Sequence, residues 1–411
     1  MKIASVDARS VFDSRGFPTV EAEVTLENGL KARSIVPSGA STGEREAIEL
    51  RDGGKAFNGK TVDKAVANIA EKIAPEIAGK DAADQKQIDK HLIELDGTSN
   101  KQNLGANAIL AVSLASAHAE AAAKSIPLYE HINSMLESNI NPRLPVPMVN
   151  IFNGGVHAAQ STAIQEFMLV PDKSLGYKQA IFMCAEIFHS LGSLLKSKSY
   201  PTTVGDEGGY APGIKSDEEV LGILSKAVES AGFKLGNDIN FALDVAASEF
   251  MQDGSYQIND SQLSKEEMID WLVKIRRKYP IVSIEDGLDE NDWDGWSDLT
   301  TRLGQDTLLV GDDLLTTNTH YLDKAIQLKA GNSILIKLNQ IGTLTETLQT
   351  IEQARSAGWD YVISHRSGET EDTTISHLAV GTAAPYIKTG STSRGERTAK
   401  YNELLRIAES V

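Results

Sequence analysis

The chain has 411 residues, of which 41% are hydrophobic and 24% are charged. This length exceeds one ordinary domain but suits a barrel of roughly 250 residues with a smaller companion domain. Lys and Arg number 40 and Asp and Glu number 57, so the net charge of −17 argues against binding to nucleic acid or to anionic lipid. An anionic small molecule could still bind where a cation or a local basic cluster reverses the field.

Cysteine usage and hydropathy indicate where such a chain would reside. Cys184 is the only cysteine, so an internal disulfide is impossible and a reducing compartment is expected. Its apolar surroundings predict a buried, inert thiol rather than a nucleophile. The N-terminus shows no apolar signal region, and no stretch reaches the ~18 apolar residues that span a bilayer. We therefore expect a cytoplasmic protein with no membrane segment.

The first part of the chain predicts mixed α and β structure. Residues 19–26 alternate in polarity, and Asn28-Gly29 separates them from a second such run at 30–36, which is typical of a β-hairpin. Helical periodicity follows over 62–73, and residues 104–124 form an alanine-rich segment that predicts a buried helix. Prolines then cluster over 142–147 and cannot continue a helix. We place the domain boundary just before them, which gives an α+β capping domain over 1–137 and a second domain over 138–411.

The second part predicts a βα repeat. Ser216 with Glu219, and Ser264 with Glu267, are capping-box patterns that begin helices. Short apolar runs recur between helix-length segments, and each run closes on an ionisable group, in turn Asp244, Glu285, Asp312, Lys337, His365 and Lys388. Successive units of this kind favour a TIM-type (β/α)₈ barrel, with a doubly wound open sheet as the alternative. In either fold the carboxyl ends of the strands gather in one place, so these six side chains should surround one cavity.

Three of the six are carboxylates on neighbouring strands. Asp244, Glu285 and Asp312 would repel one another unless a cation sits between them, and hard oxygen ligands of this kind suit Mg²⁺. Zinc is not expected, because the chain has no thiolate ligand pattern and its histidines lack metal-site spacing. Lys337 should lie one strand further round, where burial and a divalent cation would lower its pKa and make it a base.

Two glutamates and three loops could complete a site. Glu166 lies in IQEFM and Glu207 in GDEGG, and either could act as an acid. The loop PSGASTG (37–43) could close over a ligand, and NGGVH (153–157) and SHRSG (364–368) carry His157 and Arg366. Each of these short segments alone is more typical of an ordinary turn, so only the set points to a site.

Taken together, these segments closely resemble the enolase family. The matching strings extend from DSRG (13–16) to AKYNELLRI (399–407) and include VGDEGGYAP, SIEDGLDENDWDGW, VGDDLLTTN, SILIKLNQIGT and VISHRSGETEDTTI. The resemblance implies an N-terminal α+β domain on an eight-stranded barrel whose first strands are not all parallel. It also implies a homodimer or a ring of dimers, and a hydro-lyase that converts 2-phosphoglycerate to phosphoenolpyruvate in glycolysis and gluconeogenesis.

The resemblance assigns a role to each candidate residue. Lys337 would be the base at C2, and Glu207 the acid for the C3 hydroxyl, with Glu166 and His157 beside it. Substrate would contact a set of residues around the cavity, namely Ser41, His157, Glu166, His365, Arg366, Ser367 and Lys388. Asp244, Glu285 and Asp312 would bind one Mg²⁺, and Ser41 a second Mg²⁺ that arrives with substrate.

The chain departs from the family pattern in places that put local packing and loop dynamics in doubt, and two alternative functions stay open beside it. Phe17 follows DSRG where the family usually has Asn, and Ala-Ala-Gln-Ser follows His157 where many relatives have Asp-Asn. A related lyase or racemase acting on another carboxylate would leave Glu207 or the Arg366 phosphate site idle. A binding or structural protein would be expected to lack Lys337 or a metal carboxylate, and all of them are present.

Overall fold

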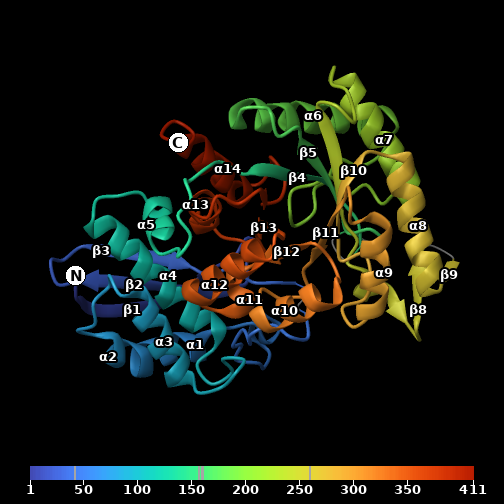
Figure 1. The fold of residues 1–411 in the computed structure, drawn as a ribbon. Coiled ribbons are helices and arrows are strands. Elements are labelled where there is room, and N and C mark those ends of the chain that lie inside the picture. The colour runs from blue at the N-terminus through green and yellow to red at the C-terminus, as the bar shows by residue number, and fades with distance from the viewer. Residues whose placement is uncertain (41–42, 156–157, 159–161, 259–260) are drawn as a thin grey trace.

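The computed structural model describes residues 1–40, 43–155, 158, 162–258 and 261–411. Figure 1 shows an N-terminal part, with a small sheet and several helices, lying beside a barrel built by the rest of the chain. The described residues include no helix with both the length and the apolarity that a bilayer crossing requires.

The N-terminal sheet has three antiparallel strands, β1 (Ile3–Phe12), β2 (Pro18–Leu26) and β3 (Lys31–Ile35). The predicted hairpin is confirmed, since β2 and β3 pair directly and Gly29 in the turn between them has a positive φ of 83°. That conformation is readily accessible to glycine, which explains the Asn-Gly at this position.

Helices pack on one side of this sheet (Figure 1). They are α1 (Asp63–Asn68), α2 (Ala74–Ile77), α3 (Gln85–Asp96), α4 (Ala106–Ala123) and α5 (Leu128–Ser134). The predicted helix over 62–73 is present but passes through a π-helical turn at Ile69–Ile73, just before Pro75, which has no N–H to complete the α-helical ladder. Helix α4 is buried on nearly every side, as predicted.

Eight strands close into a barrel, which confirms the predicted (β/α)₈ architecture and excludes the open sheet. They are β4 (Val146–Asn153), β5 (Glu166–Pro171), β6 (Ile239–Asp244), β10 (Ile281–Glu285), β11 (Leu308–Gly311), β12 (Ser333–Ile336), β13 (Asp360–Ser364) and β14 (Tyr386–Lys388). Strand β5 is antiparallel to both β4 and β6, whereas the other neighbours are parallel. The boundary proposed near residue 137 falls between α5 and β4 and stays a prediction.

Helices alternate with the later strands and lie around the barrel (Figure 1). They are α6 (Tyr177–Ser197), α7 (Asp217–Ser230), α8 (Lys265–Lys278), α9 (Trp293–Leu303), α10 (Thr319–Leu328), α11 (Leu338–Ile341), α12 (Leu344–Ser356), α13 (Thr374–Gly381) and α14 (Gly395–Ile407). Ser264 and Glu267 form the predicted capping box at α8. At α7, Ser216 accepts the capping hydrogen bond as predicted. The Glu219 side chain, which was expected to complete the capping box, instead accepts a hydrogen bond from the Tyr200 hydroxyl. A small sheet of β7 (Met251–Gln252), β8 (Ser255–Ile258) and β9 (Ser261–Leu263) follows β6.

Strand register sets charged groups at one end of the barrel. Glu166 begins β5 and pairs with Asp244 at the end of β6, and Asp244 pairs in turn with Glu285 at the end of β10. Because β5 runs opposite to its neighbours, its first residue lies where the other strands finish. Below this level the barrel is filled by apolar side chains, namely Met148, Met168, Val170, Ala242, Val310, Leu335 and Val362. The charged groups therefore lie above a layer of buried apolar side chains.

Candidate active site

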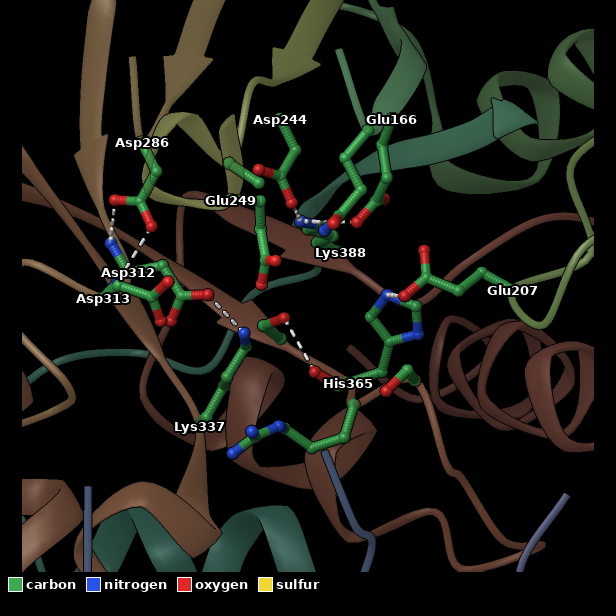
Figure 2. Close-up of a pocket in the computed structure, with 15 residues that line it drawn as sticks. Glu166, Glu207, Asp244, Glu249, Asp286, Asp312, Asp313, Lys337, His365 and Lys388 are labelled. Atoms are coloured by element: carbon green, nitrogen blue, oxygen red, sulfur yellow. Dashed lines mark hydrogen bonds and ion pairs between the residues drawn. The ribbon is translucent and has the colours of Figure 1, made fainter. Parts of the chain in front are cut away.

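A pocket lies at the carboxyl ends of the barrel strands (Figure 2). It gathers most of the residues predicted from the sequence, namely Glu166, Glu207, Asp244, Asp312, Lys337, His365, Arg366, Ser367 and Lys388. Glu285 lies directly beside them through an ion pair with Lys388. Ser41 and His157 lie outside the described residues, so their predicted roles remain predictions.

Lys388 is the electrostatic centre of one side of the pocket. Its Nζ lies 2.8 Å from both Asp244 Oδ2 and Glu285 Oε1 and 3.0 Å from Glu166 Oε1. Burial alone lowers the pKa of Lys388, but the charges of Asp244 and then Glu166 raise it well above its usual value. A fully protonated ammonium group therefore holds these buried carboxylates together.

The three predicted metal carboxylates lie at the ends of adjacent strands but do not all share one partner. Asp244 and Glu285 share Lys388, whereas Asp312 pairs with Lys337 on the other side. Burial and then the charge of Asp244 raise the pKa of Glu285 well above its ordinary value. Crowded, buried oxygen ligands of this kind fit a hard divalent cation, which would relieve their repulsion.

Two sets of described residues bring at least three possible ligand atoms within 4.8 Å of one another. One set is Glu166, Glu207 and His365, and the other is Asp286, Asp312 and Asp313. The acidic lining is thus richer than predicted, and it could bind a metal ion in more than one arrangement.

Lys337 lies beside Asp312, with which it forms an ion pair, and its side chain is 14% exposed. Among the protein's own groups the pKa of Lys337 is raised, and the lowering expected from a divalent cation stays a prediction. Burial lowers it, and the neighbouring charge of Asp312 raises it by more. This lysine is protonated at neutral pH, so it can accept a proton only when another cation shares the charge of Asp312.

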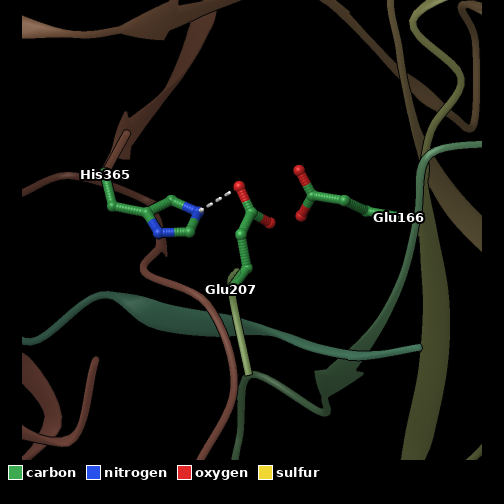
Figure 3. A group of neighbouring side chains, drawn as sticks. All are labelled: Glu166, Glu207 and His365. Carbon is green, nitrogen blue, oxygen red and sulfur yellow. Dashed lines mark ion pairs between the residues drawn. The ribbon is translucent and has the colours of Figure 1, made fainter. Parts of the chain in front are cut away.

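Glu166, Glu207 and His365 meet on the opposite side of the pocket (Figure 3). His365 Nε2 lies 3.8 Å from Glu207 Oε1, and Asn150 donates a 2.9 Å hydrogen bond to Glu207 Oε2. Burial and then the charge of Glu207 raise the pKa of Glu166 well above its usual value. Burial lowers the pKa of His365 well below its usual range. This side therefore combines a carboxyl group whose pKa burial raises with an imidazole whose pKa burial lowers.

The predicted phosphate-binding residues lie at the rim. Arg366 donates from Nη1 and Nη2 to Glu46, at 2.9 and 3.2 Å, and from Nη1 to Asn339 Oδ1 at 2.9 Å. Ser367 Oγ accepts a 2.7 Å hydrogen bond from the backbone N–H of Ala40. The loop that follows β3 thus reaches across the barrel to this rim.

The sequence analysis did not identify several residues that lie beside the predicted site residues. Asp286 and Asp313 follow predicted ligands directly, and a doubled acid in SIEDG and GDD was the available signal. Asp286 has a positive φ of 41° and accepts from the backbone N–H groups of Asp312 and Asp313, both at 2.9 Å. Fully buried Arg397 on α14 donates to the carbonyl oxygens of Arg366 at 2.7 Å and Ser367 at 2.6 Å, and no local signal indicated this role.

Two family models match almost the whole chain. The model described as "Enolase, N-terminal domain" matches residues 3–132, and "Enolase, C-terminal TIM barrel domain" matches residues 141–411. The chain belongs to the enolase family. Membership confirms the resemblance seen in the sequence and the barrel-plus-cap fold. It identifies a lyase-type enzyme that acts on a small molecule, in a family that is typically metal-dependent.

Proposed function

We propose that this enolase-family protein catalyses the reversible dehydration of 2-phosphoglycerate to phosphoenolpyruvate in glycolysis and gluconeogenesis. One observation supports this reaction above others. Lys337 enters the pocket from one side, and Glu207 with Glu166 and His365 enters from the other (Figure 2). An elimination needs a base and an acid on different atoms of the substrate, and this separation suits both tasks.

The residues divide the reaction between them. Lys337 Nζ takes the proton from C2, and Glu207 delivers a proton to the departing C3 hydroxyl, with Glu166 as its neighbour and His157 as a further contact. The carboxylate end of the substrate lies toward Lys388. Arg366 and Ser367 bind the phosphate, and His365 and Ser41 are further substrate contacts.

Asp244, Glu285 and Asp312 would hold one Mg²⁺, and Ser41 would contribute to a second Mg²⁺ that arrives with substrate. The ligand atoms support this choice, because all three residues are buried and offer only carboxylate oxygens, the hard ligands that Mg²⁺ prefers. When bound, Mg²⁺ supplies positive charge beside the substrate carboxylate, which becomes more negative as the C2 proton leaves.

The test is direct. Purified protein, 2-phosphoglycerate and Mg²⁺ are mixed, and the ultraviolet absorbance of the enol product is followed with a chelator control. We expect a rise that the chelator abolishes. A flat trace from folded protein would contradict the proposal, and turnover of unphosphorylated glycerate at an equal rate would indicate a different lyase.

We further propose a cytoplasmic location and assembly into a homodimer or a ring of dimers. Analytical ultracentrifugation measures the assembly, and a monomer at micromolar concentration would contradict it. Cell fractionation tests the location, and recovery in the membrane fraction would contradict that proposal.

A further inference from the structure

A buried glutamine lies between the partner of Lys337 and the partner of Arg366. Gln340, on the short helix α11 that follows Lys337, is 1% exposed. Its Nε2 donates to Asp312 Oδ1 at 2.8 Å and to Glu46 Oε1 at 3.3 Å, and its Oε1 accepts from Thr317 Oγ1 at 2.8 Å. The amide can adopt only this orientation, because a flipped oxygen would face two carboxylates.

Gln340 orients the partner of the proposed base. The Asp312 carboxylate receives Gln340 on Oδ1 and the Lys337 ammonium on Oδ2. Because each oxygen has a partner, rotation of the Asp312 carboxylate is restrained, and the position of the Lys337 ammonium is restrained with it. The backbone is held as well, because the Lys337 N–H donates a 2.9 Å bond to Thr317 Oγ1, the same hydroxyl that binds Gln340.

Glu46 extends this chain of contacts to Arg366. Its Oε1 accepts from Gln340 and from the Gly43 N–H, the latter at 3.1 Å, while both its oxygens receive the Arg366 guanidinium. A backbone bond of 2.8 Å from Ala47 N to Gln340 O ties the same loop to α11. Both Glu46 and Arg366 are buried, so these contacts exchange little with water.

We propose that Gln340 and Glu46 are positioning residues that hold Lys337 and Arg366 in a fixed relation to each other. The inference rests on the proposed function, in which Lys337 removes a proton and Arg366 binds phosphate. A substrate that spans both groups needs them at one separation. The two residues maintain that separation by linking α11 to the rim segment that follows β13.

The first variant is Gln340→Met, which keeps the side-chain length and removes every amide hydrogen bond. Displacing a catalytic group by about 1 Å can cost about 10²-fold in rate. We expect kcat to fall by about 10²-fold while KM changes by less than about threefold, since Arg366 keeps its other contacts. A folded Gln340→Met protein with wild-type kcat would overturn the proposal.

The second variant is Glu46→Gln. Its amide N–H group would face donors from Gln340 and Arg366, so one of those contacts is lost. We expect kcat to fall by about tenfold without a rise in KM, because Arg366 no longer has a carboxylate competing with phosphate. A raised KM with unchanged kcat would instead make Glu46 a simple wall of the phosphate site and refute the coupling.

Gln85→Met is the matched control. Gln85 is also a buried glutamine that donates to a buried aspartate, Asp89, at 2.9 Å, but it lies on α3 away from the pocket. We expect it to lower the midpoint of urea unfolding while kcat and KM stay at wild-type values. An equal loss of kcat in Gln85→Met and Gln340→Met would reduce the effect to general destabilisation.

If Gln340→Met does not fold, Thr317→Val and Thr317→Ser give a second comparison. Valine has nearly the same shape but no hydroxyl, so it loses both contacts, whereas serine keeps them. We expect about a tenfold lower kcat for Thr317→Val and near-normal kcat for Thr317→Ser. Equal kcat in the two variants would overturn the proposal.

A crystal structure of Gln340→Met, or of Thr317→Val if the first does not fold, gives a readout that needs no substrate. We expect the Asp312 carboxylate to rotate and Lys337 Nζ to move relative to Arg366. Unchanged positions would refute the positioning role. A wild-type protein that fails to convert 2-phosphoglycerate would count against the proposed function, and the crystal structure would still decide the positioning question.

Discussion

Replacing Lys388 with methionine tests the charge balance of the pocket. The ammonium lies 2.8 to 3.0 Å from three carboxylate oxygens, on Asp244, Glu285 and Glu166, and the lysine side chain is 3% exposed. Methionine fills most of the same volume but supplies no charge. The variant therefore leaves buried carboxylates without their common partner.

The size of the effect follows from this burial. Removing one partner of a buried ion pair costs about 3–5 kcal/mol, because the remaining charge is left uncompensated. Partial protonation of a carboxylate moves the loss toward the lower end of this range. With a urea m value of about 3 kcal/mol/M, the unfolding midpoint should fall by about 1 M.

The assay is urea unfolding of wild type and Lys388→Met in the presence of chelator and then of Mg²⁺. We expect Mg²⁺ to raise the midpoint of the variant by more than that of wild type, because the unpaired Asp244 and Glu285 carboxylates can bind it. Lys400→Met is the control, since Lys400 is equally buried but pairs with Glu369, outside the pocket, at 2.8 Å. An unchanged midpoint in chelator would refute the charge argument. Equal Mg²⁺ effects in the two variants would refute competition between Lys388 and Mg²⁺ for these carboxylates.

Further predictions concern chemistry and stability. Lys337→Ala should abolish exchange of the substrate C2 proton, and residual exchange by mass spectrometry would remove this lysine from the base role. Glu207→Gln should retain that exchange but slow water loss by about 10²–10⁴-fold, and equal loss of both steps would contradict its role as acid. A hydrogen bond from His377 lowers the pKa of Glu403 to about 2, below its ordinary 4.5. The ionised Glu403 therefore stabilises the fold above about pH 4.5, and this contribution is lost as pH falls through about 2. Glu403→Gln should lower the free energy of unfolding by about 1–2 kcal/mol at pH 7. An equal difference in urea midpoint between wild type and variant at pH 7 and at pH 3 would contradict this. Trp296 is fully buried, so Trp296→Ala should leave a core cavity and lower the free energy of unfolding, measured in urea, by about 3–5 kcal/mol. The folded fraction should keep a normal kcat. A loss below about 1 kcal/mol would show that neighbouring side chains collapse into the cavity.

Local patterns in the sequence were sufficient for the elements and for many of the site residues. A hairpin at Asn28-Gly29, a capped helix at Ser264 and strands that end on Asp244, Glu285 and Lys388 depend on neighbours within a few residues. Parallel strands bring their carboxyl ends to one edge in any α/β fold. Many of the residues that line the pocket could therefore be predicted before its shape was known.

Tertiary structure alone decided which of these groups are partners. Closure through β14 and β4, and the reversed direction of β5, set Glu166 beside Asp244 across a distance of 78 residues in sequence. The same packing set Lys388 beside Asp244 and Glu285 and paired Lys337 with Asp312, whose charge raises the pKa of Lys337. Side-chain pairing and pKa depend on separations of a few ångströms between remote segments, and no periodicity or spacing in one sequence carries that information.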